Sequence, residues 1–144
     1  METTTMGKVI VTAKIESLED LLAVQRGKLT ADKVRNVDVA DALVDTGSIM
    51  FGMPQRLIAP LGLLPFRTRT VRTAGGLTTL TLYNAVRLTV QGRDCHCDVM
   101  ELPDDCPVLI GQIPLEQLDF VIDPMNQRLI GNPEHGGQHM IDAF

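Results

Sequence analysis

Tryptophan is absent from the 144 residues, and the only aromatic side chains are four phenylalanines and one tyrosine. A core built mainly on aromatic rings is therefore excluded, and valine, leucine and isoleucine must fill the interior. Hydrophobic residues still make up 44% of the chain and charged residues 22%, which is ordinary for a globular domain. The length suits one domain that can bury a sizeable core.

Long apolar runs and an excess of basic charge are also missing. No run approaches the roughly 18 residues of a membrane span, and residues 1–8 lack the features of a secretory signal. The net charge of −5 argues against nucleic acid or an anionic membrane as the main partner. Three cysteines, an odd number, fit a reducing compartment better than a disulfide framework. We expect a cytoplasmic protein without a membrane or nucleic-acid partner.

Short β-rich runs dominate the chain, which contains no internal repeat. They predict a mostly β protein with two or three short helices. The expected strands cover residues 8–15, 35–44, 108–110, 120–123 and 128–130. Residues 66–102 are expected to be mostly strand, with a long hairpin around Ala74–Gly76 and a second tight turn at Gln91–Arg93. The expected helices run from the cap Ser17 to Gly27, over 54–61, and from Pro114 to Leu118. The last dozen residues are expected to form a loose tail.

One of these strands ends in an aspartate. Asp45 directly follows the apolar residues 42–44, and a carboxylate at the end of a buried strand is costly unless something holds it. Thr46 and Gly47 come next. One explanation is an Asx-turn in which Gly47 supplies a positive φ, and the other is a catalytic carboxylate. The tripeptide alone does not decide between them.

Two further features favour catalysis. An apolar-apolar-glycine motif at Leu109–Gly111 precedes a short helix, and a hairpin with a glycine turn at Ala74–Gly76 lies between the two motifs. In this order, the Asp45–Ser48 motif, the hairpin and the second motif resemble the retropepsin-like (retroviral-type) aspartic protease family. The resemblance covers residues 35–131. It implies a closed β-barrel of the acid-protease fold.

The resemblance divides the chain into three parts. Residues 35–131 are the expected retropepsin-like protease domain. Residues 1–34 are an N-terminal extension made of a strand and a short helix, either packed on the domain or serving as a pro-segment. Residues 132–144 are a C-terminal tail that falls outside the resemblance.

The implied function is that of a homodimeric aspartic endopeptidase. The chain has one Asp-Thr-Gly and no Asp-Ser-Gly, so two copies of Asp45, one per subunit, would flank a two-fold axis. Two carboxylates in direct contact across this axis cannot both ionise, so they share one proton and act as base and acid toward a water molecule. The implied substrate is a peptide or protein, and neither a cofactor nor a metal is implied.

The resemblance also assigns supporting residues. The amide of Gly47 would donate to the carboxylate, the Thr46 hydroxyl would lock the two loops together, and Ser48 would hydrogen-bond the outer carboxylate oxygen. The flap tip consists of Ala74, Gly75 and Gly76, and the second signature of Leu109, Ile110 and Gly111.

The sequence departs from the family at two places. Ile49–Phe51 follow Ser48 where viral members often carry acidic residues that bind the substrate backbone, so more apolar subsites are expected. Gln112–Pro114 follow the second signature in place of Arg and then Asp or Asn. The salt bridge of those family residues is therefore absent, which leaves family-like dimer contacts open.

Two other clusters have both a chemical and a plainer explanation. Cys95-His96-Cys97 with Cys106 suggests zinc, but a strand points His96 away from its two neighbours, which favours ordinary half-buried thiols. His135 and His139 have the spacing of a helical metal pair, but two glycines lie between them, which favours a solvated tail.

The expected hairpin also has two explanations. Arg67, Arg69 and Arg72 nearly alternate, either as one solvated strand face or as a grip on acidic substrate. The Gly75-Gly76 pair is either a plain turn or a flap tip that opens and closes. The alternative function is a non-catalytic dimerisation or peptide-binding module with a retropepsin fold. A small β protein with a chance Asp-Thr-Gly explains neither the second signature nor the hairpin.

Overall fold

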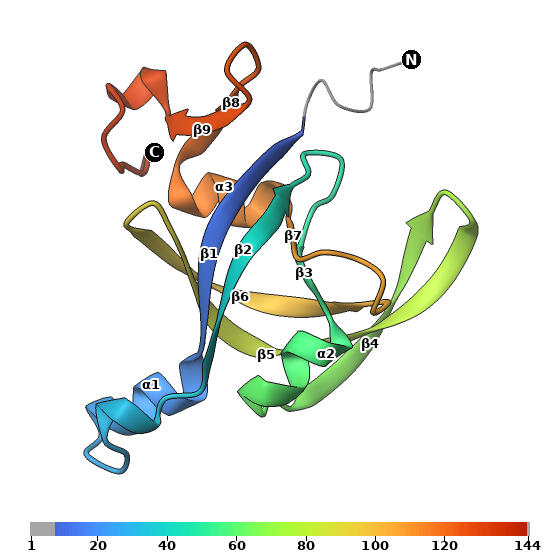
Figure 1. Ribbon diagram of the computed structural model, residues 1–144, viewed down its shortest axis with the longest axis vertical. Coiled ribbons are helices and arrows are strands. Elements are labelled where there is room, and N and C mark those ends of the chain that lie inside the picture. The colour runs from blue at the N-terminus through green and yellow to red at the C-terminus, as the bar shows by residue number, and fades with distance from the viewer. Residues whose placement is uncertain (1–7, 144) are drawn as a thin grey trace.

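The computed structural model describes residues 8–143 and is mostly β (Figure 1), as the sequence predicts. The strands are β1 (Val9–Ser17), β2 (Asn36–Val44), β3 (Phe51–Pro54), β4 (Pro65–Thr73), β5 (Gly76–Val90), β6 (Arg93–Leu102), β7 (Leu109–Ile110), β8 (Phe120–Asp123) and β9 (Arg128–Gly131). The helices are α1 (Leu18–Gln25), α2 (Gln55–Ile58) and α3 (Gln112–Leu118), with the 3₁₀ turns η2 (Ala31–Lys33), η3 (Ala59–Leu61) and η4 (Pro133–His135). None of the helices within residues 8–143 is long and apolar enough to cross a bilayer.

Most of the strands close into a barrel. The order of the seven-stranded sheet is β1-β2-β7-β3-β6-β5-β4, and β1 also pairs with β5. The ring β1-β2-β7-β3-β6-β5 is therefore closed, and β4 alone of this sheet lies outside it. Strand β5 allows this because it has 15 residues. Its first half pairs with β4 and its second half with β1.

Aliphatic side chains fill the barrel. Along β1, Val9, Val11, Ala13 and Ile15 are buried, whereas the residues between them are exposed. Phe51 is the largest of the fully buried side chains, and most of the others are valine, leucine and isoleucine. Burial of each such side chain contributes roughly 1.5–3 kcal/mol. The aliphatic core therefore replaces the aromatic residues that the sequence lacks.

Residues N-terminal to β2 are joined to the barrel. Strand β1 pairs with both β2 and β5. Ser17 caps α1 by accepting a hydrogen bond from the Asp20 amide (3.2 Å), and Gly27, with a φ of 72°, follows the end of the helix. The guanidinium of Arg35 lies 2.8 Å from Asp20 and lowers the pKa of that carboxyl group. This ion pair joins α1 to the start of β2.

The β4–β5 hairpin projects away from the barrel (Figure 1). Its turn contains Ala74 and Gly75, and Gly76 has a φ of 112°, which favours glycine. At the other end of the hairpin, Tyr83 donates a hydrogen bond to Glu101 of β6, which raises the pKa of Tyr83 to about 12. The base of the hairpin is therefore fixed to the barrel, whereas its tip is exposed.

Three local features differ from the sequence-based expectations. Strand β3 was not expected, because its four residues are identified by pairing with β6 and β7 rather than by periodicity. Helix α3 begins at Gln112, so Pro114 is its third residue and not its first. The C-terminal residues are not loose, since they contain η4 and Arg93 donates a hydrogen bond to the carbonyl of Gly137 (2.6 Å).

Candidate active site

Asp45 begins the loop that connects β2 with β3. Its amide donates a hydrogen bond to the carbonyl of Ile110 (3.0 Å), which extends the parallel pairing of β2 with β7. The Gly47 amide donates to Oδ1 of Asp45 (2.9 Å), and the Ser48 amide donates to the Asp45 carbonyl (3.0 Å). The half-buried carboxylate is thus oriented by the backbone of its own loop.

Glycine is favoured at position 47 because a side chain there would crowd the Asp45 carboxylate, and not because the backbone is left-handed. Gly47 is not among the glycines with a positive φ, so that part of the Asx-turn explanation is wrong, although the bond from its amide to Oδ1 of Asp45 is the bond of an Asx-turn. A Cβ atom there would instead lie 3.2 Å from Oδ1 of Asp45, tighter than most such contacts. Glycine therefore lets the amide approach the carboxylate closely.

The start of α3 supports this loop from behind. The consecutive amides of Gly111, Gln112 and Ile113 donate to the carbonyls of Met50 (3.1 Å), Ser48 (2.9 Å) and Ile49 (2.9 Å), respectively. Amides in the first turn of a helix have no partner inside the helix, and here they satisfy the loop carbonyls. The second signature thereby joins the Asp45 loop to a helix.

Gly111 permits this close approach. It is buried, and a Cβ atom at this position would lie 2.5 Å from the carbonyl oxygen of Met50 and 2.7 Å from that of Ser48. Both neighbours are backbone atoms, which cannot move aside by rotating a side chain. Its φ of −89° is accessible to any residue, so the requirement for glycine is steric alone.

Gln112 is a loop contact that sequence reasoning missed. Its side-chain Nε2 donates a hydrogen bond to the carbonyl of Thr46 (2.7 Å), the residue directly after Asp45. The sequence indicated only that Gln112 departs from the family pattern. Within residues 8–143, no hydrogen bond joins the hydroxyl of Ser48 to Asp45, so that expected contact is not found in the subunit.

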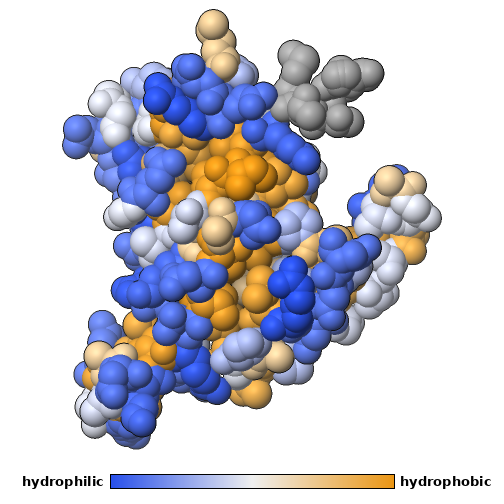
Figure 2. Space-filling view, viewed as in Figure 1, coloured by the Kyte–Doolittle hydropathy of each residue, from blue (hydrophilic) through white to orange (hydrophobic). Residues whose placement is uncertain are grey.

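Apolar side chains surround the exposed side of the loop. Ile49 is 64% exposed and Ile113 is 47% exposed, although both are large and apolar. Ile10 of β1 is 51% exposed and pairs with the half-buried Leu43 just before Asp45. Figure 2 shows apolar surface gathered over the upper part of β1 and β2, toward this loop. An exposed apolar patch beside a polar site is typical of a surface that binds another protein.

The flap hairpin, residues 65–83, carries the predicted flap tip at Ala74–Gly76. The Thr73 hydroxyl accepts a hydrogen bond from the Gly75 amide (3.2 Å) and donates to the Gly76 carbonyl (3.0 Å), which shapes the turn. Leu77 beside the tip is 71% exposed. The tip of the hairpin is therefore apolar, whereas the strands below it expose threonines and arginines.

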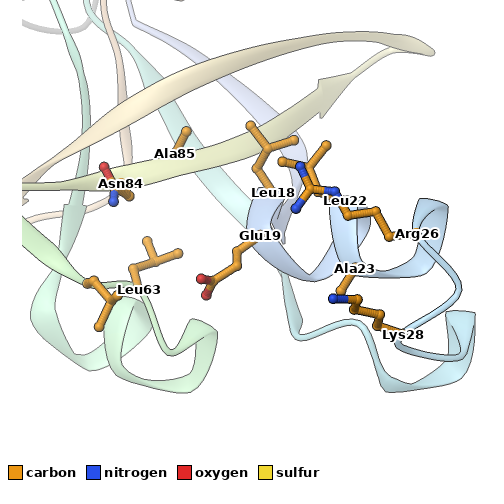
Figure 3. A pocket seen from close by; sticks show the side chains of 10 residues that line it. Leu18, Glu19, Leu22, Ala23, Arg26, Lys28, Leu63, Asn84 and Ala85 are labelled. Atoms are coloured by element: carbon orange, nitrogen blue, oxygen red, sulfur yellow. The ribbon is translucent and has the colours of Figure 1, made fainter.

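A cavity of about 440 Å³ lies elsewhere, between α1 and the loop that precedes β4 (Figure 3). Four leucines and two alanines contribute to its lining, and Glu19 is the one acidic residue there. Asp45 is not among the lining residues. The cavity is therefore separate from the Asp45 loop, which remains the candidate site.

The cysteine and histidine clusters do not form a metal site within residues 8–143. On β6, Cys95 and Cys97 point inward and His96 is exposed, as strand alternation predicts. A hydrogen bond with Cys95, together with burial, raises the pKa of Cys97. His135, by contrast, is not solvated: it lies 2.7 Å from Asp119 and 3.0 Å from Asp142.

Comparison with protein families finds one matching model, described as aspartyl protease, over residues 30–131. The matched region contains the Asp45 loop, the flap hairpin and the Gly111 motif that supports the loop. A comparison with curated proteins finds no match. The matched region is most of the chain and carries the loop geometry described above. The protein therefore belongs to the aspartyl protease family of retropepsin-like type.

Proposed function

We propose that the protein is a homodimeric aspartic endopeptidase whose active site is assembled from two Asp45 carboxylates, one from each subunit. The observation that carries this proposal is the support of Asp45, whose carboxylate accepts a hydrogen bond from the Gly47 amide (2.9 Å) on a loop bonded to α3. No cation within residues 8–143 pairs with this carboxylate. It is therefore free to act on a substrate.

The chemistry requires two acids of different protonation. One Asp45 carboxylate takes a proton from water, and the water oxygen forms a bond to the carbonyl carbon of the peptide. The other Asp45, protonated, gives its proton to the carbonyl oxygen. Collapse of the tetrahedral intermediate breaks the C–N bond, and the amine leaves with a proton from the acid pair. One subunit supplies one of the two groups, so two subunits are required.

The surface around the loop supports a dimer. Thr46 is exposed directly beside the carboxylate, where its hydroxyl can bond to the partner loop. Ile49 and Ile113 expose 64% and 47% of their area next to it. Covering these side chains with a second copy related by a two-fold axis would remove apolar area from water and bring the two carboxylates together.

The alternative is a non-catalytic dimerisation or peptide-binding module. It requires the same fold and the same apolar surface, but not the acid. Asp45 distinguishes the two functions, because a binding module gains nothing from two carboxylates that repel each other.

The test is the Asp45→Asn variant, assayed by mass spectrometry on a peptide library of mixed sequence. Asparagine keeps the shape and loses the ionisable group, so we expect cleavage to fall by at least about 10²-fold. The matched control is Asp41→Asn, which removes an exposed acid from β2, the strand that precedes the Asp45 loop. Undiminished cleavage in the Asp45 variant would overturn the proposal. A wild-type protein that dimerises and binds peptides without cutting them would establish the binding module.

A further inference from the structure

The flap hairpin is basic although the protein is acidic. Residues 65–83 contain Arg67, Arg69 and Arg72 but no aspartate or glutamate. The whole chain carries a net charge of −5. Positive charge is therefore concentrated on the hairpin to which the family resemblance assigns the role of a flap over the substrate. Such segregation raises the local concentration of anionic ligands.

These arginines also lack acidic partners. Elsewhere within residues 8–143, five arginine side chains bind carboxylates or carbonyls, namely Arg35, Arg56, Arg87, Arg93 and Arg128, whereas Arg26 has no such contact. In the hairpin, Arg67 stacks over the Phe66 ring at 4.7 Å. The side chains of Arg69 and Arg72 are exposed, and their guanidinium groups have no hydrogen bond or ion pair with any residue that the structure describes. The guanidinium donors of the hairpin are thus available to a ligand.

The strand register sets the spacing of these donors. Arg67 pairs with Leu82 and Arg69 with Leu80, so both arginines lie on one face of the hairpin. Residues two apart on a strand are separated by roughly 6.6 Å. An extended peptide places alternate side chains on one face at the same spacing. Two carboxylates at alternate positions of a peptide therefore match this pair of arginines.

Strand β4 is also open to backbone pairing. Within residues 8–143 it forms the last strand of the sheet and pairs only with β5. Its outer edge carries the N–H and C=O groups that an added strand can bond. All of its residues except Val71 are exposed. Charge, spacing and a free edge thus occur on the same strand.

We propose that β4 selects acidic substrates: an extended segment with carboxylates at alternate positions lies along this strand and pairs with Arg67 and Arg69. The proposal rests on the proteolytic function proposed above. Each guanidinium offers a planar pair of donors that matches one carboxylate. Because these arginines lie five or more residues from the turn, the acidic positions of the substrate lie several residues from the cleaved bond.

A competing explanation is protection of the sheet edge. Charged residues on an edge strand prevent strands of other molecules from adding to it. That explanation requires charge alone, so lysine serves as well as arginine. Selection of carboxylate substrates, by contrast, requires the planar donors of arginine, which lysine lacks. The Arg67→Lys/Arg69→Lys double variant therefore separates the two roles.

The experiment uses two peptides built around a bond that the wild-type protein cleaves in the library. One carries two glutamates at alternate positions, four and six residues from that bond, and the other carries glutamines. We expect kcat/KM to favour the glutamate peptide by about tenfold at low salt and by less at high salt. Arg67→Gln/Arg69→Gln removes the preference, and the lysine double variant retains only part of it. The matched control, Arg26→Gln, removes an exposed arginine outside the hairpin and keeps the preference.

Binding to the Asp45→Asn variant, measured by fluorescence anisotropy, tests the selection without any cleavage. Preferential binding of the glutamate peptide supports the proposal even if the catalytic assignment fails. Equal affinity for both peptides overturns it. If the lysine double variant has the same peptide affinities as the wild type and the glutamine double variant aggregates, the arginines protect the sheet edge and the proposal is overturned. A single-stranded oligonucleotide that displaces the glutamate peptide at lower concentration would assign the hairpin to nucleic acid and overturn the proposal.

Discussion

The identity of single residues at the Asp45 loop is explained by how closely the backbone of the loop approaches the start of α3. Gly111 is the clearest case, since a methyl group there meets the carbonyl oxygens of Met50 and Ser48 at 2.5 and 2.7 Å. These carbonyls accept bonds from the start of α3. Any side chain at position 111 therefore pushes the Asp45 loop away from the helix that supports it.

Gly111→Ala should destabilise the protein and misplace the carboxylate. Overpacking of a tight site costs about 1–3 kcal/mol, which we expect as a lower melting temperature together with a loss of cleavage. Gly75→Ala is the stability control, because a Cβ atom there meets only the Thr73 hydroxyl at 3.8 Å. A Gly111→Ala variant with wild-type melting temperature and activity would show that the second signature has no structural role.

Residues with local contacts were predictable from the sequence, and residues with distant contacts were not. The bond from the Gly47 amide to Asp45 spans two residues, so the motif itself indicates it. The bond from Gln112 to the Thr46 carbonyl spans 66 residues. Nothing in the sequence around Gln112 specifies that partner, and the absence of the family arginine was the only sign that this position differed.

At the scale of elements, the C-terminal segment is held by a cluster around Asp119. This residue ends α3 with a φ of 59°, and its carboxylate lies 2.7 Å from Nδ1 of His135. It also accepts a hydrogen bond from the Met140 amide (3.1 Å). Asp142 faces the other nitrogen of His135 at 3.0 Å, and Arg93 donates to the Asp119 carbonyl (2.8 Å). The tail is thus joined to the C-terminal end of α3.

This cluster predicts a pH dependence of stability. The bonds to Asp119 and then Asp142 raise the pKa of His135, and the bond to His135 lowers the pKa of Asp119 to about 2. The contribution of His135 is complete below its unfolded pKa of about 6.5 and is lost as pH rises through the raised value. The contribution of Asp119 is complete above about pH 4 and is lost toward pH 2. The tail is therefore held best between about pH 4 and 6.5.

His135→Gln should lower the melting temperature at pH 5.5 and have a smaller effect at pH 9, because glutamine keeps a donor but gains no charge. Hydrogen exchange of residues 136–143 should rise in the variant at the lower pH. The control is His96→Gln, which changes an exposed histidine on β6. Equal loss of stability at both pH values would show that the charge of His135 contributes nothing.

The sequence failed at this segment because its bonds join elements that are distant in the chain. Gly136 and Gly137 both have positive φ, but the sequence-based expectation for this segment was a loose tail. His135 contacts Asp119, which lies 16 residues away in the chain, and the carbonyl of Gly137 accepts a bond from Arg93, which lies 44 residues away. By contrast, the long strands, the cap at Ser17 and the glycine turn of the hairpin were predictable, since periodicity and local turn chemistry specify them.

At the scale of the whole molecule, the closed barrel accounts for the stability of a single subunit but supplies only one acid. Closure through β1 and β5 leaves β4 as the free strand of the large sheet and places Asp45 in an exposed loop. A lone subunit thus has a folded core but only one copy of the Asp45 carboxylate. In the proposed mechanism, that subunit cannot both take and give a proton in the hydrolysis.

Specific activity should therefore fall on dilution. In the proposed mechanism the dimer is the catalytic species, and its fraction depends on subunit concentration by mass action. Below the dimer dissociation constant the rate should rise with about the square of total protein, and above it linearly. Adding excess Asp45→Asn chains should suppress wild-type activity by forming mixed dimers with one working acid. Sedimentation analysis across the same dilution series would identify the species present, and full activity in a monomeric sample would refute the shared site.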